Sequence, residues 1–598
     1  MKRKSFKKKL LFFIFMFIFP FFSKINANIM ADSIDYIYLD LNCSKVIINE
    51  DIYSGCVYQT IDGVTTSLSV SGDHFSSNYY YIYQSNSTNK STTGLIENSK
   101  EIILPSYSSL NSTISSFINN TDVEGGITKF KTDATGAGRE ETGNMISITG
   151  SSTFDITIDN LWSSFQTNST SRKDGGISFL PSNVSKAIIR LKGENRFGNI
   201  FYQNNNTSTS LEITSIDGAN EINGSLVVAN VNSGSSFNHY NSGIGASDTG
   251  DHAVGINITG GTIYVGTNTK DNCTAIGGGG NGRGYVNISG GIITAVSNST
   301  GTAIGGGIGE SSYGGDASVK ITGGLIYAYN LGYVYVSNGT FIPGVAIGGG
   351  SSRLSTGNKN TTIEITGGEI YAQSVGGVAI GGGNSASKDG GPATISISGD
   401  AVVTASSVAG SYTYKGSVYQ IMPGSGIGGG TGGTTGNGGS ATVNISGGKI
   451  SSGTIGGGET NSTSSSYSVG DAYVEITGGE ITGRVLMYKG TFDISGGSFI
   501  SNVNKPVFRL SDSFKDNHPK FITGGKYSSD PSNYLESSYS TSLENDMYEV
   551  TTSTISVFAF NNQKNNNFIV SIIIIIGLCI IVYLNRDKIL KIKNSLKY

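Results

Sequence analysis

A phrase that recurs along the middle of the chain restricts the fold more than any other feature. It reads apolar-x-Ile-Thr/Ser-Gly-Gly-x-Ile-x-Ala, and its copies are INITGGTIYV (256–265), VNISGGIITA (286–295), VKITGGLIYA (319–328), IEITGGEIYA (363–372), ISISGDAVVTA (395–405), VNISGGKISS (443–452), VEITGGEITG (474–483), FDISGGSFIS (492–501) and FITGGKYSS (521–529). A single copy is too small to bury its own apolar face, so repeats of this kind form stacked arrays.

A second phrase, Ile-Gly-Gly-Gly, lies between copies of the first, and its isoleucines are Ile276, Ile304, Ile347, Ile380, Ile427 and Ile455. Alternation places Val319 and Ile321 on one face of a strand, and Ile326 and Ala328 on one face of the next strand. The isoleucine of the second phrase begins a third short strand. Three strands per unit, separated by glycine turns, predict an all-β parallel solenoid, or β-helix, with stacked isoleucines inside and a coil of about 30 residues.

The neighbouring parts of the chain divide around this solenoid, which we expect to cover residues 141–535. Residues 28–140, which include the tyrosine-rich YYYIYQ at 79–84, are predicted to form a small β region or an N-terminal cap. Residues 536–567 are predicted to finish the other cap and to continue as an Asn-rich spacer. Caps are expected because an open solenoid end would stack with other chains.

Both ends of the chain carry apolar runs flanked by basic residues. Residues 1–27 show a basic region, an apolar run from Leu10 to Phe22 and a small residue at Ala27, which predicts a cleaved signal peptide; an uncleaved anchor is the alternative. Residues 568–584 would form a helix of about 25 Å, slightly short of the hydrocarbon core, and flanking residues that reach to the interface would let it cross a bilayer. The basic tail at 585–598 predicts a cytoplasmic C-terminus. The sequence therefore predicts a single-pass protein at the cell surface, with its N-terminal part outside.

The distribution of charge limits which partners the chain can bind, and the cysteines indicate a possible disulfide. The two basic ends hold 12 of the 40 Lys and Arg residues, so the part between them is strongly acidic although the whole chain has a formal net charge of −3. Nucleic acid is an unsuitable partner for such a surface, because phosphate binding needs concentrated basic residues. Cys43 and Cys56 can form a disulfide in an exported protein, and two unpaired cysteines are the alternative.

Two insertions provide the candidate binding site. Residues 329–345 and 406–425 both lengthen the connection between the second strand and the Ile-Gly-Gly-Gly strand, at the same corner of coils two units apart. Insertions at one face of a repeat protein often form its binding surface. Their aromatic residues suit pyranose rings or a partner protein, or else pack on the solenoid wall as a satellite core. The candidates are Tyr329, Tyr333, Tyr335, Phe341, Tyr412, Tyr414 and Tyr419, and the outward Tyr264, Tyr327 and Tyr371 could extend them.

No catalytic constellation is recognisable. Asp316 and Asp471 occupy equivalent positions but are placed five units apart by the repeat count, and Glu364 and Glu475 are about three coils apart, too far to share a substrate bond. We therefore expect no enzyme activity and no cofactor. Carboxylates in Gly-rich turns could bind Ca²⁺, although no DxDxDG or GGxGxD phrase occurs in the sequence. The carboxylates available to it are those of Asp248, Asp251, Asp271 and Asp316.

The alternating I-T/S-G-G-x-I-x-A and A-I-G-G-G phrases resemble β-helical surface proteins of low-GC gut Firmicutes and their relatives. LKGENRFG (191–198) and ITGGKYSSDPSNYL (522–535) are similar to a coil and to a closing phrase of that group. The resemblance implies a right-handed, pectate-lyase-like β-helix and carbohydrate binding. We expect a non-enzymatic surface adhesin that touches glycan or a neighbouring cell surface. A ligand-free structural stalk and a polysaccharide lyase are the alternatives.

Overall fold

The described part of the chain consists of strands and turns between residues 36 and 553. The computed structural model describes these residues except 50–51, 62–63, 74–78, 86–100, 106–120, 125–126, 132–141, 143, 151, 164–175, 180–185, 203–209, 231–241, 247–252, 268–273, 298–299, 310–311, 336–339, 415, 484, 502–505, 512–513 and 515–519. Within them, no helix has the length and apolar character to span a membrane. The predicted signal peptide (1–27) and membrane segment (568–584) lie outside the described residues.

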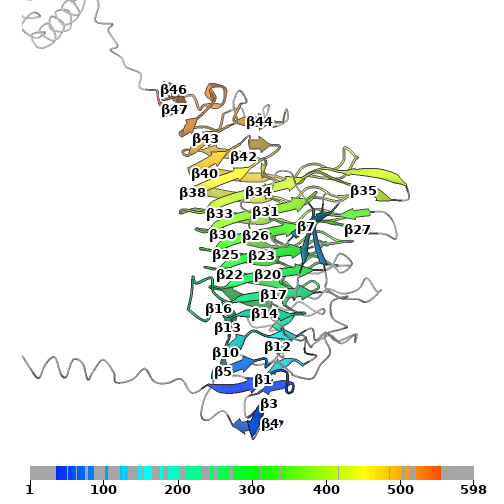
Figure 1. The fold of residues 1–598 in the computed structure, drawn as a ribbon. Helices are drawn as coiled ribbons and strands as arrows, with labels where there is room; N and C mark the ends of the chain where they lie inside the picture. Colours follow the sequence, from blue (N-terminus) through cyan, green and yellow to red (C-terminus); the bar gives the residue numbers. More distant parts are fainter. Residues whose placement is uncertain are drawn as a thin grey trace, which may run out of the picture. The chain divides into compact units, whose positions relative to one another are not determined.

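Three parallel sheets run along a stack of coils (Figure 1). The first sheet contains β1 (Ile37–Asp40), β5 (Tyr79–Tyr83), β10 (Thr153–Asp159), β13 (Lys186–Lys192), β16 (Ser210–Ser215), β19 (Ala253–Ile258), β22 (Arg283–Ile288), β25 (Ala317–Ile321), β30 (Thr361–Ile365), β33 (Ala393–Ile397) and β42 (Thr491–Ile494). The second contains β11 (Trp162–Ser163), β14 (Glu194–Phe197), β17 (Ser225–Asn230), β20 (Thr262–Thr267), β23 (Ile292–Ser297), β26 (Leu325–Asn330), β31 (Glu369–Val375), β34 (Val402–Val408), β43 (Ser498–Ile500) and β45 (Lys526–Tyr527). The long strands β38 (Ala441–Ser452) and β40 (Ala472–Thr482) belong to both sheets.

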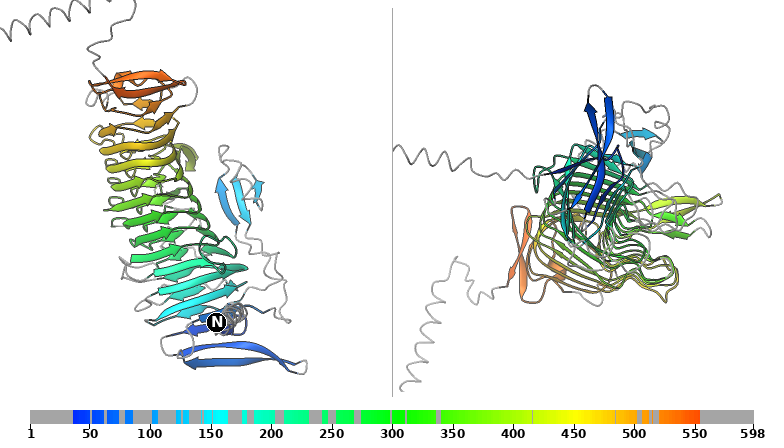
Figure 2. Two further views of the ribbon diagram at one scale, coloured as in Figure 1. Left: turned by 90° about the vertical axis from the view of Figure 1, so that its left-hand side faces the viewer. Right: turned by 90° about the horizontal axis from the view of Figure 1, so that it is seen from below.

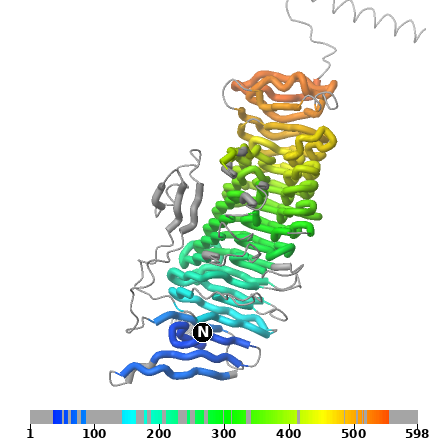
Figure 3. Tube along the Cα trace, turned by 90° about the vertical axis from the view of Figure 1, so that its right-hand side faces the viewer, coloured from blue at the N-terminus to red at the C-terminus, as the bar shows by residue number. Residues whose placement is uncertain are grey.

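The third sheet is formed by the short Ile-Gly strands and their equivalents. Its parallel strands are β2 (Val46–Ile48), β9 (Ile146–Ile148), β12 (Ile177–Phe179), β15 (Ile200–Tyr202), β18 (Ile244–Gly245), β21 (Ile276–Gly277), β24 (Ile304–Gly305), β29 (Ile347–Gly348), β32 (Ile380–Gly381), β37 (Ile427–Gly428) and β39 (Ile455–Gly456). From β9 to β40, each coil thus contributes to all three sheets, and Figure 3 traces the coils one above another. The prediction of an all-β parallel solenoid is confirmed.

The core is a set of apolar columns that pass from coil to coil. Ile304, Ile347 and Ile380 are aligned in neighbouring strands of the third sheet, and none of the three has exposed surface. On the first sheet, Val319 and Ile321 point into the core while Lys320 between them is exposed. Burying an aliphatic side chain of this size contributes about 1.5–3 kcal/mol. The columns therefore hold the stack together without a helix or a second layer.

Glycine in the Ile-Gly-Gly-Gly phrase allows the coils to approach closely. Gly348 has φ +142°, a conformation that L side chains rarely adopt. A Cβ atom there would lie 1.9 Å from the carbonyl oxygen of Gly381 in the next coil. Gly305 and Gly381 show the same geometry in their own coils. Glycine is therefore required after the isoleucine of this phrase, because successive backbones lie too close together for a side chain.

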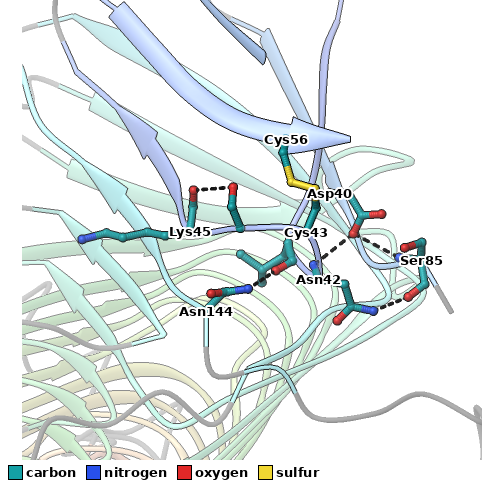
Figure 4. Close-up of a disulfide and its surroundings, with 9 residues drawn as sticks. Asp40, Asn42, Cys43, Lys45, Cys56, Ser85 and Asn144 are labelled. Carbon is teal, nitrogen blue, oxygen red and sulfur yellow. Dashed lines mark hydrogen bonds between the residues drawn. A yellow bond between two sulfur atoms is a disulfide. The ribbon is translucent and has the colours of Figure 1, made fainter. Parts of the chain in front are cut away.

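An antiparallel hairpin covers the N-terminal end of the stack. Its strands β3 (Ile52–Ile61) and β4 (Val64–Asp73) pair over ten residues, and β3 also pairs antiparallel with β2. Cys56 on β3 forms a disulfide with Cys43 in the turn after β1, so these two cysteines are paired (Figure 4). The amide groups of nearby Asn42 and Asn144 donate hydrogen bonds to backbone carbonyls and join the turn to neighbouring segments.

Aromatic side chains close the C-terminal end of the core. Phe499 and Tyr527 stack with their ring centroids 4.9 Å apart. Beside this pair, Phe508 and Phe521 pack edge-on against each other. The remaining strands there are β41 (Val485–Met487), β44 (Phe508–Leu510), β46 (Tyr539–Glu544) and β47 (Met547–Thr552), with a 3-10 turn, η3 (Ser532–Tyr534). Because β47 pairs antiparallel with β45, the parallel ladder stops at this point.

A separate antiparallel sheet lies between β5 and β9 in the sequence. Its order is β6 (Glu101–Pro105), β8 (Ile127–Lys131) and β7 (Thr121–Glu124). The range 28–140, predicted to be a β region or cap, therefore contains this sheet, the hairpin and the first strands of the solenoid itself.

Replacing Gly348 by Ala should destabilise the solenoid strongly. Strain in a non-glycine residue with this φ costs about 1–3 kcal/mol, and the clash with Gly381 adds to it. We expect a lower thermal midpoint by circular dichroism. Gly453→Ala is the matched control, because a Cβ at Gly453 meets nothing within 4 Å. Equal midpoints for the two variants would contradict the proposed role of close coil spacing.

Removing the disulfide should loosen the N-terminal cap. Its cysteines are 13 residues apart, and a loop of this size stabilises by about 3 kcal/mol through the entropy of the unfolded chain. The double variant Cys43→Ala/Cys56→Ala should show faster amide exchange in β3 and β4 than the oxidised parent. Exchange in β25 and β30, far along the stack, serves as the internal control. Unchanged exchange in the hairpin would show that other contacts hold it.

Candidate functional site

Two antiparallel hairpins project from one corner of the solenoid, where the second sheet connects to the third (Figures 1 and 2). The first hairpin consists of β27 (Tyr333–Tyr335) and β28 (Thr340–Ile342), and the second of β35 (Gly410–Tyr414) and β36 (Ser417–Ile421). They follow β26 and β34, which are separated in the sheet by β31 alone. The hairpins are therefore two coils, or about 10 Å, apart along the stack, as the sequence spacing predicts.

Strand register groups the tyrosines of each hairpin. In the second hairpin Tyr412 is directly opposite Tyr419, and Tyr414 lies two residues further along the same strand. The register therefore brings these three positions together within one hairpin. In the first hairpin Tyr333 and Tyr335 lie two residues apart on β27, opposite Ile342 and Thr340.

The bases of the two hairpins meet on the coil between them. Gly376, at the end of β31, has φ +71°. A Cβ atom at this position would lie 2.4 Å from Ile421 and 2.9 Å from the ring of Phe341. Ile421 is buried and Phe341 is half-buried. The missing side chain of Gly376 thus lets one residue from each hairpin pack against the same backbone.

Polar side chains, one buried and one half-buried, fix the two bases in place. Asn330, at the end of β26, donates a hydrogen bond to the carbonyl of Gly301 and accepts one of 2.8 Å from the N–H of Gly332, where the first hairpin begins. Ser407 accepts a 2.6 Å hydrogen bond from the N–H of Gly424, where the second hairpin returns to the solenoid. Hydrogen bonds to buried groups specify one geometry because leaving them unmade is costly. The hairpins therefore start from rigid anchor points.

Some of the candidate aromatic residues lie on the wall of the solenoid. Tyr329 is buried beside Tyr264, Val296 and Tyr327 in a second apolar cluster on the outer face of the second sheet. Its hydroxyl has no hydrogen-bond partner within the described residues. Burial raises the pKa of Tyr329 above its ordinary range, so the phenol remains neutral. Tyr329 thus occupies the satellite core that was the alternative for these residues.

The proposed aromatic extension along the same face is only partly exposed. The rings of Tyr327 and Tyr371 stack with their centroids 5.2 Å apart. Tyr264 and Tyr327 are buried, whereas Tyr371 is half-buried and packs against the cluster. This column therefore contributes packing more than accessible surface.

The seven candidates thus divide into two groups. Tyr329 and Phe341 belong to packing at the base of the site. The backbone places five on the projecting strands, namely Tyr333 and Tyr335 on β27, Tyr412 and Tyr414 on β35, and Tyr419 on β36. Gly376 and Ile421 were not singled out from the sequence. A possible signal was that Gly376 occurs at the corner where both neighbouring insertions occur.

The carboxylates of the repeats link adjacent coils. Asp316 accepts hydrogen bonds of 3.0 and 2.7 Å from the N–H groups of Lys359 and Asn360 in the following coil. Glu364 forms a 2.9 Å ion pair with Lys320, its neighbour in the strand register. Such exposed contacts contribute little stability each.

Asp316 and Asp471 are closer along the stack than the repeat count predicts. Asp471 forms an ion pair with Lys489 at 3.0 Å. The strand ladder runs from β25 through β30, β33 and β38 to β40, so Asp316 and Asp471 are four coils apart rather than five. The earlier count included one unit too many.

Most of the carboxylates that could bind Ca²⁺ lie outside the described residues. Asp248, Asp251 and Asp271 lie there, and Asp316 is engaged with backbone N–H groups. Within the described residues, no group of three or more His, Cys, Asp or Glu side chains is arranged to hold a metal ion.

A side chain at position 376 should separate the two hairpins. Gly376→Val would place methyl groups in the space occupied by Phe341 and Ile421, in a backbone conformation that valine disfavours. We expect chymotrypsin to cleave at the hairpin tyrosines several-fold faster while the circular dichroism of the solenoid is retained. Gly453→Val is the control. Equal cleavage rates for parent and Gly376→Val would contradict the shared base.

Comparisons of the chain with protein-family models, with curated proteins and with solved structures found no match.

Proposed function

We propose that this chain is an exported, membrane-anchored surface protein whose solenoid presents the two tyrosine-bearing hairpins to carbohydrate. The observation that carries the proposal is the convergence of two hairpins, encoded 77 residues apart at Tyr335 and Tyr412, on one corner with a shared base. A rigid pair of projecting ribbons is a preorganised binding element, and preorganisation lowers the entropy lost on binding.

The chemistry of the five hairpin tyrosines favours a sugar ligand. A phenol ring offers a flat apolar face and a polar tip, which suits the faces and hydroxyl groups of pyranose rings. Two hairpins about 10 Å apart would contact separate sugars of one chain. The site would bind without catalysis, and the carboxylates of Asp316, Glu364 and Asp471 serve contacts within the solenoid.

The location follows from features at the ends of the chain. The Cys43–Cys56 disulfide supports an oxidising, extracellular environment. We propose that the signal peptide is cleaved after about Ala27, that residues 568–584 cross the membrane, and that the basic tail is cytoplasmic. We also propose a right-handed solenoid, the hand that parallel connections take in nearly all proteins.

A glycan array probed with the exported segment, residues 28–560, tests the function. The variant Tyr333→Ala/Tyr335→Ala/Tyr412→Ala/Tyr414→Ala should lose binding by about tenfold or more, as expected for aromatic residues at the centre of an interface. Tyr473→Ala is the control, because this tyrosine is 44% exposed on β40, away from the corner. The circular dichroism spectra of all proteins should agree. Measurements with and without Ca²⁺ test the weaker metal expectation.

Three other outcomes of these measurements would each change the proposal. An absence of binding to any glycan would favour the structural stalk, which the continuous core and the buried Tyr329 also suit. Cleavage of an acidic polysaccharide would instead favour a lyase. Binding that survives the loss of all four tyrosines would move the glycan site away from the hairpins.

A further inference from the structure

The hairpin at the N-terminal end of the stack leaves a long strand at the edge of a sheet. Strand β4 is the last member of the 13-stranded third sheet, next to β3. It pairs with β3 over ten residues without a bulge. Edge strands present backbone groups that can pair with another chain, and proteins usually protect them with lysine, proline, bulges or short length. Strand β4 has none of these four protections, and its single charge is Asp73 at its end.

One half of the hairpin covers the core and the other half extends past it. Tyr53 and Val70 pack against the core, and Gly55 lies against Leu39. Further out, Leu68 is 50% exposed and Val64 is 62% exposed. Figure 2 shows this ribbon reaching beyond the coils above it. A two-stranded ribbon is marginally stable in water, so this half would gain stability from an additional strand.

The sequence of β4 suits pairing with itself. Val64, Leu68 and Val70 share one face, and Ser67 and Ser69 share the other. An antiparallel arrangement about a two-fold axis at Leu68 would place Leu68 opposite Leu68 of the second copy and Ser67 opposite its Ser69. Leu68 then faces Leu68 and hydroxyl groups face each other in the Ser67–Ser69 and Thr65–Ser71 pairs, while Val70 faces Thr66 and Val64 faces Gly72. No charges are opposed. This self-complementarity favours a second copy of the chain over an unrelated strand.

The opposite end of the solenoid lacks this property. Strands β46 and β47 there carry Glu544 and Glu549, and Glu549 is paired with Lys526 at 3.5 Å. These strands therefore carry charged side chains, whereas β4 carries none before its last residue, and charged side chains disfavour edge-to-edge pairing. Association is therefore directed to the N-terminal end.

We propose that two copies of this protein associate end to end through antiparallel pairing of their β4 strands. The two β3–β4 hairpins then form one four-stranded sheet between the solenoids. With the anchor of the proposed function after the last coil, the paired ends are the ends farther along the chain from the membrane segment. The geometry then allows homophilic contact between opposing cell surfaces, and this last step alone rests on the proposed anchor.

Sedimentation of the full chain in detergent tests the pairing. The parent should be dimeric at micromolar concentration. Leu68→Lys should weaken the dimer by about tenfold or more, because it places two like charges opposite each other. Leu543→Lys is the matched control, since this leucine is 61% exposed on β46 at the other end, and it should remain dimeric. A monomeric parent, or a dimeric Leu68→Lys variant, would overturn the proposal.

Amide exchange distinguishes strand pairing from a side-chain contact. Amides of β4 should gain protection as the concentration of the full chain rises. Protection of β4 that does not change with concentration would overturn the proposal, because it would mean that another segment of the same chain or another protein occupies the edge.

Vesicles reconstituted with the full chain test the contact between surfaces. They should cluster with the parent and with Leu543→Lys, and should not cluster with Leu68→Lys. A dimer in detergent without clustering would overturn the contact between opposing membranes and leave the pairing of β4 in place. Glycan binding by the hairpins is independent of both results.

Discussion

The structure depends on the close, in-register stacking of one coil on the next. In the third sheet the backbones approach so closely that a Cβ atom at Gly348 would lie 1.9 Å from a carbonyl oxygen of the following coil. The isoleucine beside each of these glycines is buried, and it aligns with the isoleucines above and below. Backbone pairing and core packing thus share one repeat distance. The sequence phrase Ile-Gly-Gly-Gly satisfies both requirements, the first with glycine and the second with isoleucine.

The same stacking explains why the solenoid was predictable from sequence. Strand alternation and the two recurring phrases correctly predicted three strands per coil and the inward residues Val319, Ile321, Ile326 and Ala328. The corner of the insertions followed from the spacing between phrases. The N-terminal hairpin was not predictable in detail, because residues 52–73 lack the repeat and their pairing is antiparallel. The burial of Tyr327 and Tyr329 was also not predictable from the sequence. Strand alternation shows that a residue points away from the core, but it does not show which neighbours cover that residue.

The candidate site uses the solenoid as a rigid support. Asn330 and Ser407 hold the points where the hairpins leave and rejoin the coils, and Gly376 lets Phe341 and Ile421 approach each other. The tyrosines expected to touch a ligand were recognisable as aromatic residues in insertions. Their supports were not recognisable, because a glycine or an isoleucine in this sequence usually belongs to the repeat. The separation of the hairpins is therefore set by the coil between them.

The orientation of the hydrogen-bond ladder has a mechanical consequence. Hydrogen bonds between coils run along the stack, whereas the chain runs around it. A force applied between the two ends of the solenoid would act along these bonds and separate coils one at a time from an end. Each released coil of about 30 residues would add roughly 100 Å of extended chain at about 3.3 Å per residue. Under load, a protein of this kind would lengthen in steps while the remaining coils stay folded.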